Sequence, residues 1–173
     1  VTEIGEAAFL NSGIVAVTIP DTVTEIEEDA FRGCTGLTDV KLPKNLKTLG
    51  KDAFNGCTGL TSVLIPKTVK NTHSYYDGIY SPFRGCNNLQ EIKFEDGMTR
   101  IPNSILCFCA AKLDIVIPSS VTEIGECAFL NSGLVTVTIP DTVTKIENGA
   151  FSGCIGLTDV KLPKNLKTLG KDA

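Results

Sequence analysis

The sequence predicts a repeat solenoid, a single array of short coils stacked on one another with a parallel β-sheet along one face. Three observations predict this fold: a period of about 23 residues, an apolar frame that returns in every period, and a composition rich in Val, Ile, Leu, Thr and Gly with no Trp. That composition favours strands and tight turns over helices. We therefore expect short strands, many turns and little helix.

The period is read from the apolar residue that opens each unit. The units start near positions 1, 23, 46, 69, 98, 121, 143 and 166, which are 22 or 23 residues apart except after position 69, where the interval is 29. Residues 69–97 therefore form an enlarged unit with an inserted loop. Neither end has a polar capping segment, so we expect residues 1–173 to be an excerpt of a longer array.

A longer period lies on top of the short one. Residues 1–53 return as residues 121–173 with only eight differences, among them Ala7 to Cys127 and Glu25 to Lys145. Duplication of a block of repeats is the simplest account, because each coil of a solenoid needs only neighbours like itself.

The unit at residues 23–45 has the clearest frame. It opens with Val23 and Ile26, an apolar pair that predicts a short extended segment. An Ala-Phe pair at residues 30–31, followed by Gly33, predicts a helical turn or a bend. One such unit cannot enclose a core, so stacking must place each apolar residue against its copy in the next coil.

A strand closes the unit. Within residues 37–43, Val40 and Leu42 point to one face and Asp39 and Lys41 to the other, as the period-two alternation of a strand requires. Proline at position 43 ends the strand, because it has no N–H for the ladder. Successive strands would lie about 4.8 Å apart in one parallel sheet.

This frame resembles the leucine-rich repeats, in particular the BspA-like branch of Treponema pallidum type. The residues that carry the resemblance are V-x-x-I, Ala-Phe, Gly-Cys and the strand ending in Pro, and they recur along the whole chain. The resemblance implies a right-handed coil and a cell-surface or secreted, extracellular protein. It also implies adhesion, with a protein or glycan at a cell surface or matrix as the partner.

Several functional classes are disfavoured by the residues themselves. The net charge is −4 and the basic residues are scattered, which argues against a nucleic-acid partner. No apolar stretch approaches the roughly 20 residues that cross a bilayer, so we expect no membrane insertion by this segment. There is no phosphate-binding loop, carboxylate pair or nucleophile elbow, and we predict neither an enzyme nor a cofactor.

Five of the seven cysteines share one frame position and would form a structural column, which comprises Cys34, Cys57, Cys86, Cys109 and Cys154. The preferred interpretation is a column of buried thiols, since free Cys packs as a small hydrophobe. A disulfide between adjacent coils is the alternative. Cys107 and Cys127 lie off the column, and we expect Cys127 to be exposed. With spacings near 23 residues and a single His, no metal site is predicted.

The enlarged unit holds the single His and all three Tyr, which are His73, Tyr75, Tyr76 and Tyr80. Insertions in solenoids map to loops that often lie on the binding face, and Tyr suits recognition surfaces. One interpretation is therefore a binding loop. The other is a tolerated surface insertion whose tyrosines cover the edge of the coil.

The outward residues of the strands complete the predicted binding surface. Most are small polar groups or charges, but Leu64 and Val116 are apolar and lie on either side of Glu91 and Lys93. In the fifth unit Ile105-Leu106 replaces Ala-Phe and the strand leucine is shifted to position 113, so we expect a distorted coil there.

Two functions follow from these observations. The first is a binding or adhesion module that uses the sheet face and the Tyr-rich insertion. The second is a structural spacer that projects another domain. End-to-end self-association through exposed apolar ends is also possible for either.

Overall fold

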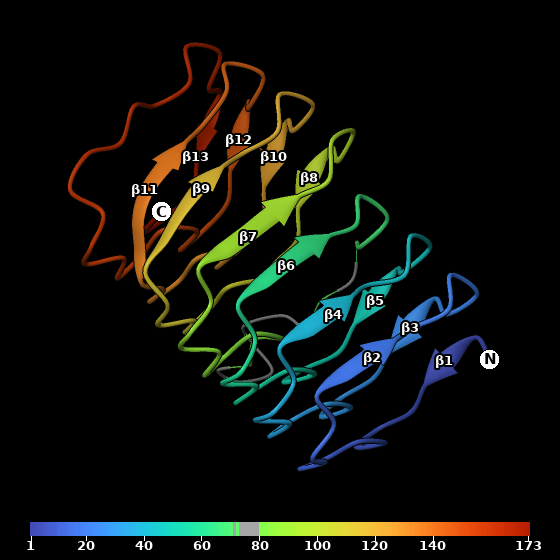
Figure 1. The fold of residues 1–173 in the computed structure, drawn as a ribbon. Coiled ribbons are helices and arrows are strands. Elements are labelled where there is room, and N and C mark those ends of the chain that lie inside the picture. The colour runs from blue at the N-terminus through green and yellow to red at the C-terminus, as the bar shows by residue number, and fades with distance from the viewer. Residues whose placement is uncertain (71, 73–79) are drawn as a thin grey trace.

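The computed structural model describes residues 1–70, 72 and 80–173. In these residues the chain forms a solenoid of about seven turns, built from short parallel strands and turns, and contains no helix. Figure 1 shows the coils stacked in sequence order, with the two termini at opposite ends of the stack. The predicted repeat solenoid with a parallel sheet is confirmed.

The larger strands form one face of the solenoid. They are β2 (Ala16–Thr18), β4 (Asp39–Lys41), β6 (Ser62–Ile65), β7 (Glu91–Phe94), β9 (Leu113–Val116) and β11 (Leu134–Thr138). The hydrogen-bonded pairs among them, β2 with β4, β6 with β7 and β9 with β11, are all parallel, and equivalent frame positions pair, as Leu64 does with Lys93. Figure 1 shows the six strands side by side in chain order. Their residues alternate between exposed and buried, as the sequence predicts.

Two-residue strands open the units and form a second set of parallel ladders. Before the enlarged unit they are β1 (Glu3–Ile4), β3 (Glu25–Ile26) and β5 (Thr48–Leu49). After it they are β8 (Arg100–Ile101), β10 (Glu123–Ile124), β12 (Lys145–Ile146) and β13 (Thr168–Leu169). The Val/Ile pair therefore makes an extended segment, as predicted.

The Ala-Phe segment is a series of tight turns rather than a helical turn. Asp29 and Gly33 have φ angles of 56° and 70°, in the left-handed region that ends any right-handed helix. From residue 29 to residue 33, successive backbone N–H groups donate in turn to the next coil and to their own coil. Those of residues 29, 31 and 33 donate to the next coil, and those of residues 30 and 32 donate to carbonyls three residues back. The turns thus form a third ladder between coils.

A stack of phenylalanine rings runs through the core beneath this ladder. The rings of Phe31 and Phe54 lie nearly parallel with centroids 5.0 Å apart, and Phe9 and Phe83 extend the stack on either side. The stack stops at the fifth coil, where Leu106 is buried in the place of the ring. It resumes with Phe129 and Phe151 at 5.2 Å.

The fifth coil also disturbs the larger sheet. Leu113 pairs with Leu134, but Asp114 pairs with Thr136, so β11 accommodates one extra residue in a bulge. The shifted leucine causes this bulge, because Leu113 must begin its strand on the buried face. The predicted local distortion is confirmed. No helix in the described part of the chain is long and apolar enough to cross a membrane.

Candidate functional site

The five cysteines of the predicted column are all buried. Four of them donate their thiol hydrogen to the backbone carbonyl of a phenylalanine in the preceding coil, at S···O distances of 3.0 to 3.1 Å. Those four are Cys34, Cys57, Cys86 and Cys154. None of the seven cysteines, all of which lie in the described residues, is in a disulfide.

Burial makes these thiols poor nucleophiles. It raises the pKa of Cys57 and Cys107 to about 12, and that of Cys109 and Cys127 to about 11. Because the thiolate is the reactive form, the column contributes packing and hydrogen bonds rather than chemistry.

The prediction that Cys127 is exposed is wrong. Its side chain is 5% exposed and packs with Cys107 and Leu130 in a small cluster outside the main core. The next coil covers it closely, since a Cβ at Gly149 would lie 3.2 Å from the Cys127 Sγ. In residues 1–53, the copy of residues 121–173, the equivalent residues are Ala7 and Asp29. The larger Cys127 therefore occurs together with the smaller Gly149.

The enlarged unit is described only in part. His73, Tyr75 and Tyr76 lie outside the described residues. Tyr80 is described, and its ring centre lies 3.5 Å from the Nζ of Lys51, in cation–π contact. Lys51 also pairs with Glu28 at 2.9 Å, and this hydrogen bond is the main reason that the pKa of Lys51 is raised. Tyr80 is therefore anchored to the third coil.

Three consecutive coils bury a polar side chain at one position of the turn, which sequence reasoning did not identify. These are Asp52, Ser81 and Ser104. Ser81 donates to the Ile105 carbonyl at 3.2 Å, whereas Asp52 Oδ1 and Ser104 Oγ have no hydrogen-bond partner among the described residues. Burial raises the pKa of Asp52, although a hydrogen bond with Asn55 opposes it.

A hollow of about 590 Å³ opens on the larger sheet over β6, β7 and β9. We call it the strand-face hollow, and its lining consists of Leu64, Glu91, Lys93, Glu95, Asp96, Asp114 and Val116, together with Ile92, Phe94 and Pro118. It brings together all four strand-face residues that the sequence predicted. Two of them, Leu64 and Val116, are 54% and 69% exposed.

The charge of the strand-face hollow is unbalanced. Four carboxylates and one ammonium line it, and that ammonium, on Lys93, pairs with Glu91 at 2.7 Å. Glu95 accepts the backbone N–H of Lys67 at 2.9 Å. Asp114 accepts a hydrogen bond from the Thr136 hydroxyl at 2.6 Å, which leaves its negative charge in place. The hollow therefore combines two exposed apolar side chains with a net negative charge.

A second hollow of about 390 Å³ adjoins the first over β4 and β6, and Leu64 and Glu95 line both. Its other charged groups are Asp39, Lys41 and Lys44, so its charges balance. Negative charge thus increases along the sheet from β4 toward β9.

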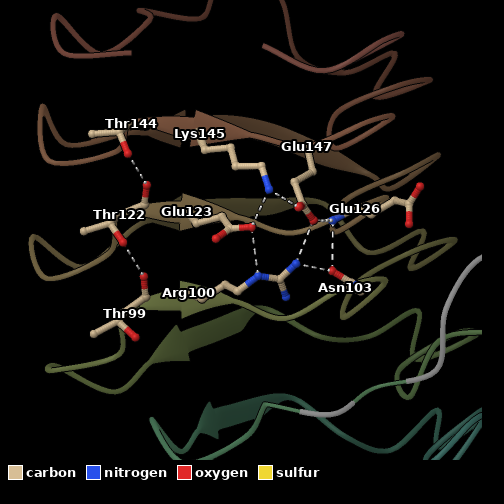
Figure 2. Close-up of polar contacts among 9 residues, drawn as sticks. All are labelled: Thr99, Arg100, Asn103, Thr122, Glu123, Glu126, Thr144, Lys145 and Glu147. Atoms are coloured by element: carbon tan, nitrogen blue, oxygen red, sulfur yellow. Dashed lines mark hydrogen bonds and ion pairs between the residues drawn. The ribbon is translucent and has the colours of Figure 1, made fainter. Parts of the chain in front are cut away.

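A network of charges occupies the opposite, short-strand side of the later coils (Figure 2). Arg100 contacts Glu123 at 3.2 Å and Glu147 at 2.7 Å, and Lys145 contacts the same two carboxylates at 3.1 and 2.5 Å. Burial alone would raise the pKa of Glu147, but its Lys145 hydrogen bond and the Arg100 charge hold it below its usual value. Glu147 also accepts the backbone N–H of Glu126 at 3.0 Å. The network joins three coils.

Residues 1–53, the copy of residues 121–173, have a different arrangement of charges at the equivalent positions. Glu3, Glu25 and Glu27 correspond to Glu123, Lys145 and Glu147, and their carboxylate oxygens lie within 4.8 Å of one another. Such exposed acidic groups are common without a cation, and we assign no metal centre to them. The exchange of Glu25 for Lys145 therefore changes a repulsive cluster into an ion-pair network.

Comparison with known proteins agrees with these repeats. The profile of the BspA type leucine rich repeat region matches residues 2–132 and 79–173. No curated protein matches the chain.

Three solved structures are similar to the chain. A leucine rich cell surface protein of Faecalibacterium prausnitzii A2-165 shares 35% identity over 91% of this chain and 42% of its own, with a TM-score of 0.66. A leucine-rich repeat protein of Bacteroides ovatus shares 29% over 99% and 49%, with a TM-score of 0.69. The T. pallidum leucine-rich repeat protein shares 28% over 98% and 67%, with a TM-score of 0.61. The chain thus spans less than half of the first two proteins. The repeated frame, the stacked parallel coils and the profile match lead to one conclusion: the chain belongs to the BspA-type leucine-rich repeat family.

Proposed function

We propose that the chain is a non-catalytic binding module of a cell-surface or secreted protein, and that it recognises a protein or glycan partner through the strand-face hollow. Membership of a leucine-rich repeat family suggests a protein-interaction or structural module. One similar structure belongs to a cell surface protein, which supports the extracellular location.

A single observation carries the binding proposal. Leu64 and Val116 expose apolar side chains in a column of the larger sheet that elsewhere holds Thr18, Lys41 or Thr138. Apolar groups that gather in a hollow with a polar rim are typical of an interaction site. The other coils of this sheet show that the fold does not need apolar residues there.

The groups that could react give no support to catalysis. The thiols are buried with raised pKa values, and the one ammonium that lines the hollow, on Lys93, pairs with Glu91. Leucine-rich repeats are generally non-enzymatic, and the hollow offers apolar area and ion pairs. Binding is therefore the function that the geometry supports best.

The test is binding of the purified chain to an array of extracellular-matrix proteins and glycans. The variant is the double substitution Leu64→Thr with Val116→Thr, which copies residues that this column already holds. The matched control is Thr18→Ser, in the same column outside both hollows. We expect the double variant to lose a partner that the wild type and the control retain. Equal binding by all three proteins would remove the hollow from the proposal.

A Tyr75→Ser, Tyr76→Ser and Tyr80→Ser variant on the same array tests the proposed contribution of the enlarged unit. Loss of binding in that variant alone would assign recognition to the insertion.

The alternative function is a spacer that projects another domain. Backbone hydrogen bonds join successive coils, and phenylalanine rings stack from Phe9 to Phe83 and again from Phe129 to Phe151, an arrangement that suits a stiff rod. A well-folded chain that binds nothing on the array would favour this alternative.

A further inference from the structure

The strand-face hollow has a chemistry specific enough to identify its ligand class. Leu64 and Val116 occupy the same column of β6 and β9, with the β7 residue Lys93 between them. Two strand spacings correspond to about 10 Å, the distance that three residues of an extended polyproline II segment span, with the first and fourth side chains on the same side. The apolar surface thus matches two apolar side chains on one short segment.

The charges around this surface define the flanks of the ligand. Asp96 is exposed and has no hydrogen-bond or ion-pair partner among the described residues, and Asp114 keeps its charge while it accepts a hydrogen bond from Thr136. Both carboxylates lie at the β7–β9 end of the two hollows. Lys41 and Lys44 lie at the β4 end. A ligand with basic groups therefore gains energy at the β9 end only.

Resting on the proposed function, we propose that the strand-face hollow binds an extended peptide segment that carries two apolar side chains and a flanking Lys or Arg. The apolar side chains lie on Leu64 and Val116, and the flanking basic group lies against Asp114 or Asp96, which line the same hollow. A neutral glycan would leave these carboxylates without a partner of opposite charge, and an acidic peptide would be repelled.

Titration with synthetic peptides tests this inference. The probe is a short blocked peptide with two leucines three positions apart and a lysine on either side, labelled for fluorescence anisotropy. One comparison peptide replaces both lysines with glutamate, another replaces both leucines with serine, and a neutral oligosaccharide is the third. We expect the basic apolar peptide to bind at least about tenfold more tightly than the others, and more weakly as salt is added.

Variants of the chain locate the charge. Asp96→Asn with Asp114→Asn keeps the hydrogen-bonding shape and removes two charges, and it should weaken the basic peptide about tenfold. The matched control is Asp159→Asn, at the column position equivalent to Asp114 in the last coil. Binding by the control should equal that of the wild type.

The outcomes separate this inference from the proposed function. Equal affinity for the basic and acidic peptides, or unchanged binding by the double Asn variant, would overturn the charge assignment. Binding of the oligosaccharide in place of the peptide would overturn the ligand class. In either case, loss of the array partner in the Leu64→Thr and Val116→Thr variant would still support the hollow as a binding site.

Discussion

The thiols are the residues whose chemistry the fold changes most. At pH 8 a thiol with a pKa of about 12 has about 1,000-fold less thiolate than one at its ordinary value of 9.0. We therefore expect Cys57 and Cys107 of the native chain to react very slowly with a thiol reagent such as Ellman's reagent. In denaturant without reductant, all seven cysteines should react rapidly. A smaller number would show that a disulfide forms, and fast reaction of the native chain would contradict the burial.

Asp52 is a residue whose charge the fold opposes. Because burial raises its pKa, its contribution to stability is fully present in acid and is lost as the pH rises through the folded-state pKa. Asp52→Asn should therefore raise the melting temperature at pH 7 and leave it unchanged in strong acid. Asn also tolerates the φ of 52° at this position.

The control for that measurement is Asp29→Asn, at the same position one coil earlier. Asp29 is less buried and pairs with Arg32 at 3.3 Å, so its loss should bring no stabilisation. Stabilisation of both variants alike would mean that the effect does not come from the burial of Asp52.

At the scale of the elements, the phenylalanine stack is the feature that the core depends on. Phe54 is fully buried between Phe31 and Phe83, with ring centroids 5.0 and 5.6 Å away. Phe54→Ala should lower the free energy of unfolding by about 3–5 kcal/mol, measured by urea titration. Phe9→Ala removes a ring that is 37% exposed and should cost much less. Equal losses would show that stacking, rather than burial, sets the energy.

The charge network offers a comparison between two copies of one element. Glu147→Gln removes a carboxylate that Arg100 and Lys145 share, and it should lower the free energy of unfolding by about 1 kcal/mol at low salt. Glu27→Gln makes the same change in the acidic cluster of the first block and should be neutral or stabilising. A destabilisation of equal size in both variants would assign the effect to the backbone N–H that each glutamate accepts.

The pH dependence of the first effect has a definite sign. The pKa of Glu147 is held below its usual value, so the network stabilises the fold above that value and is lost as the pH falls. The difference between the wild type and Glu147→Gln should therefore disappear in acid.

At the scale of the whole molecule, each coil contacts mainly the coils on either side. A defect should then remain local, as expected for a one-dimensional array. In hydrogen exchange measured by mass spectrometry, Phe54→Ala should expose amides of residues 46–68 and their neighbours and leave residues 143–165 protected. Uniform loss of protection along the chain would show that the array unfolds as one unit.

The sequence predicts the parts of this molecule that depend on one coil. The exposed Leu64 and Val116 follow from the alternation of each strand, and the place of the column cysteines follows from their frame position. The features that it does not predict depend on contacts between coils. The burial of Cys127 requires the glycine at position 149 in the next coil, and the burial of Asp52 depends on how the turns stack.

The near-identity of residues 1–53 and 121–173 has a consequence for how the array changes in length. The sixth coil is a copy of the first, and it stacks on the fifth with continuous hydrogen bonds. A coil with the sequence of the first coil can therefore stack on the C-terminal side of a coil with the sequence of the fifth. Recombination between the two matching stretches of the gene could add or remove a whole block and always produce this same junction. Selection could then lengthen or shorten the rod in one genetic step, without evolving a new contact surface.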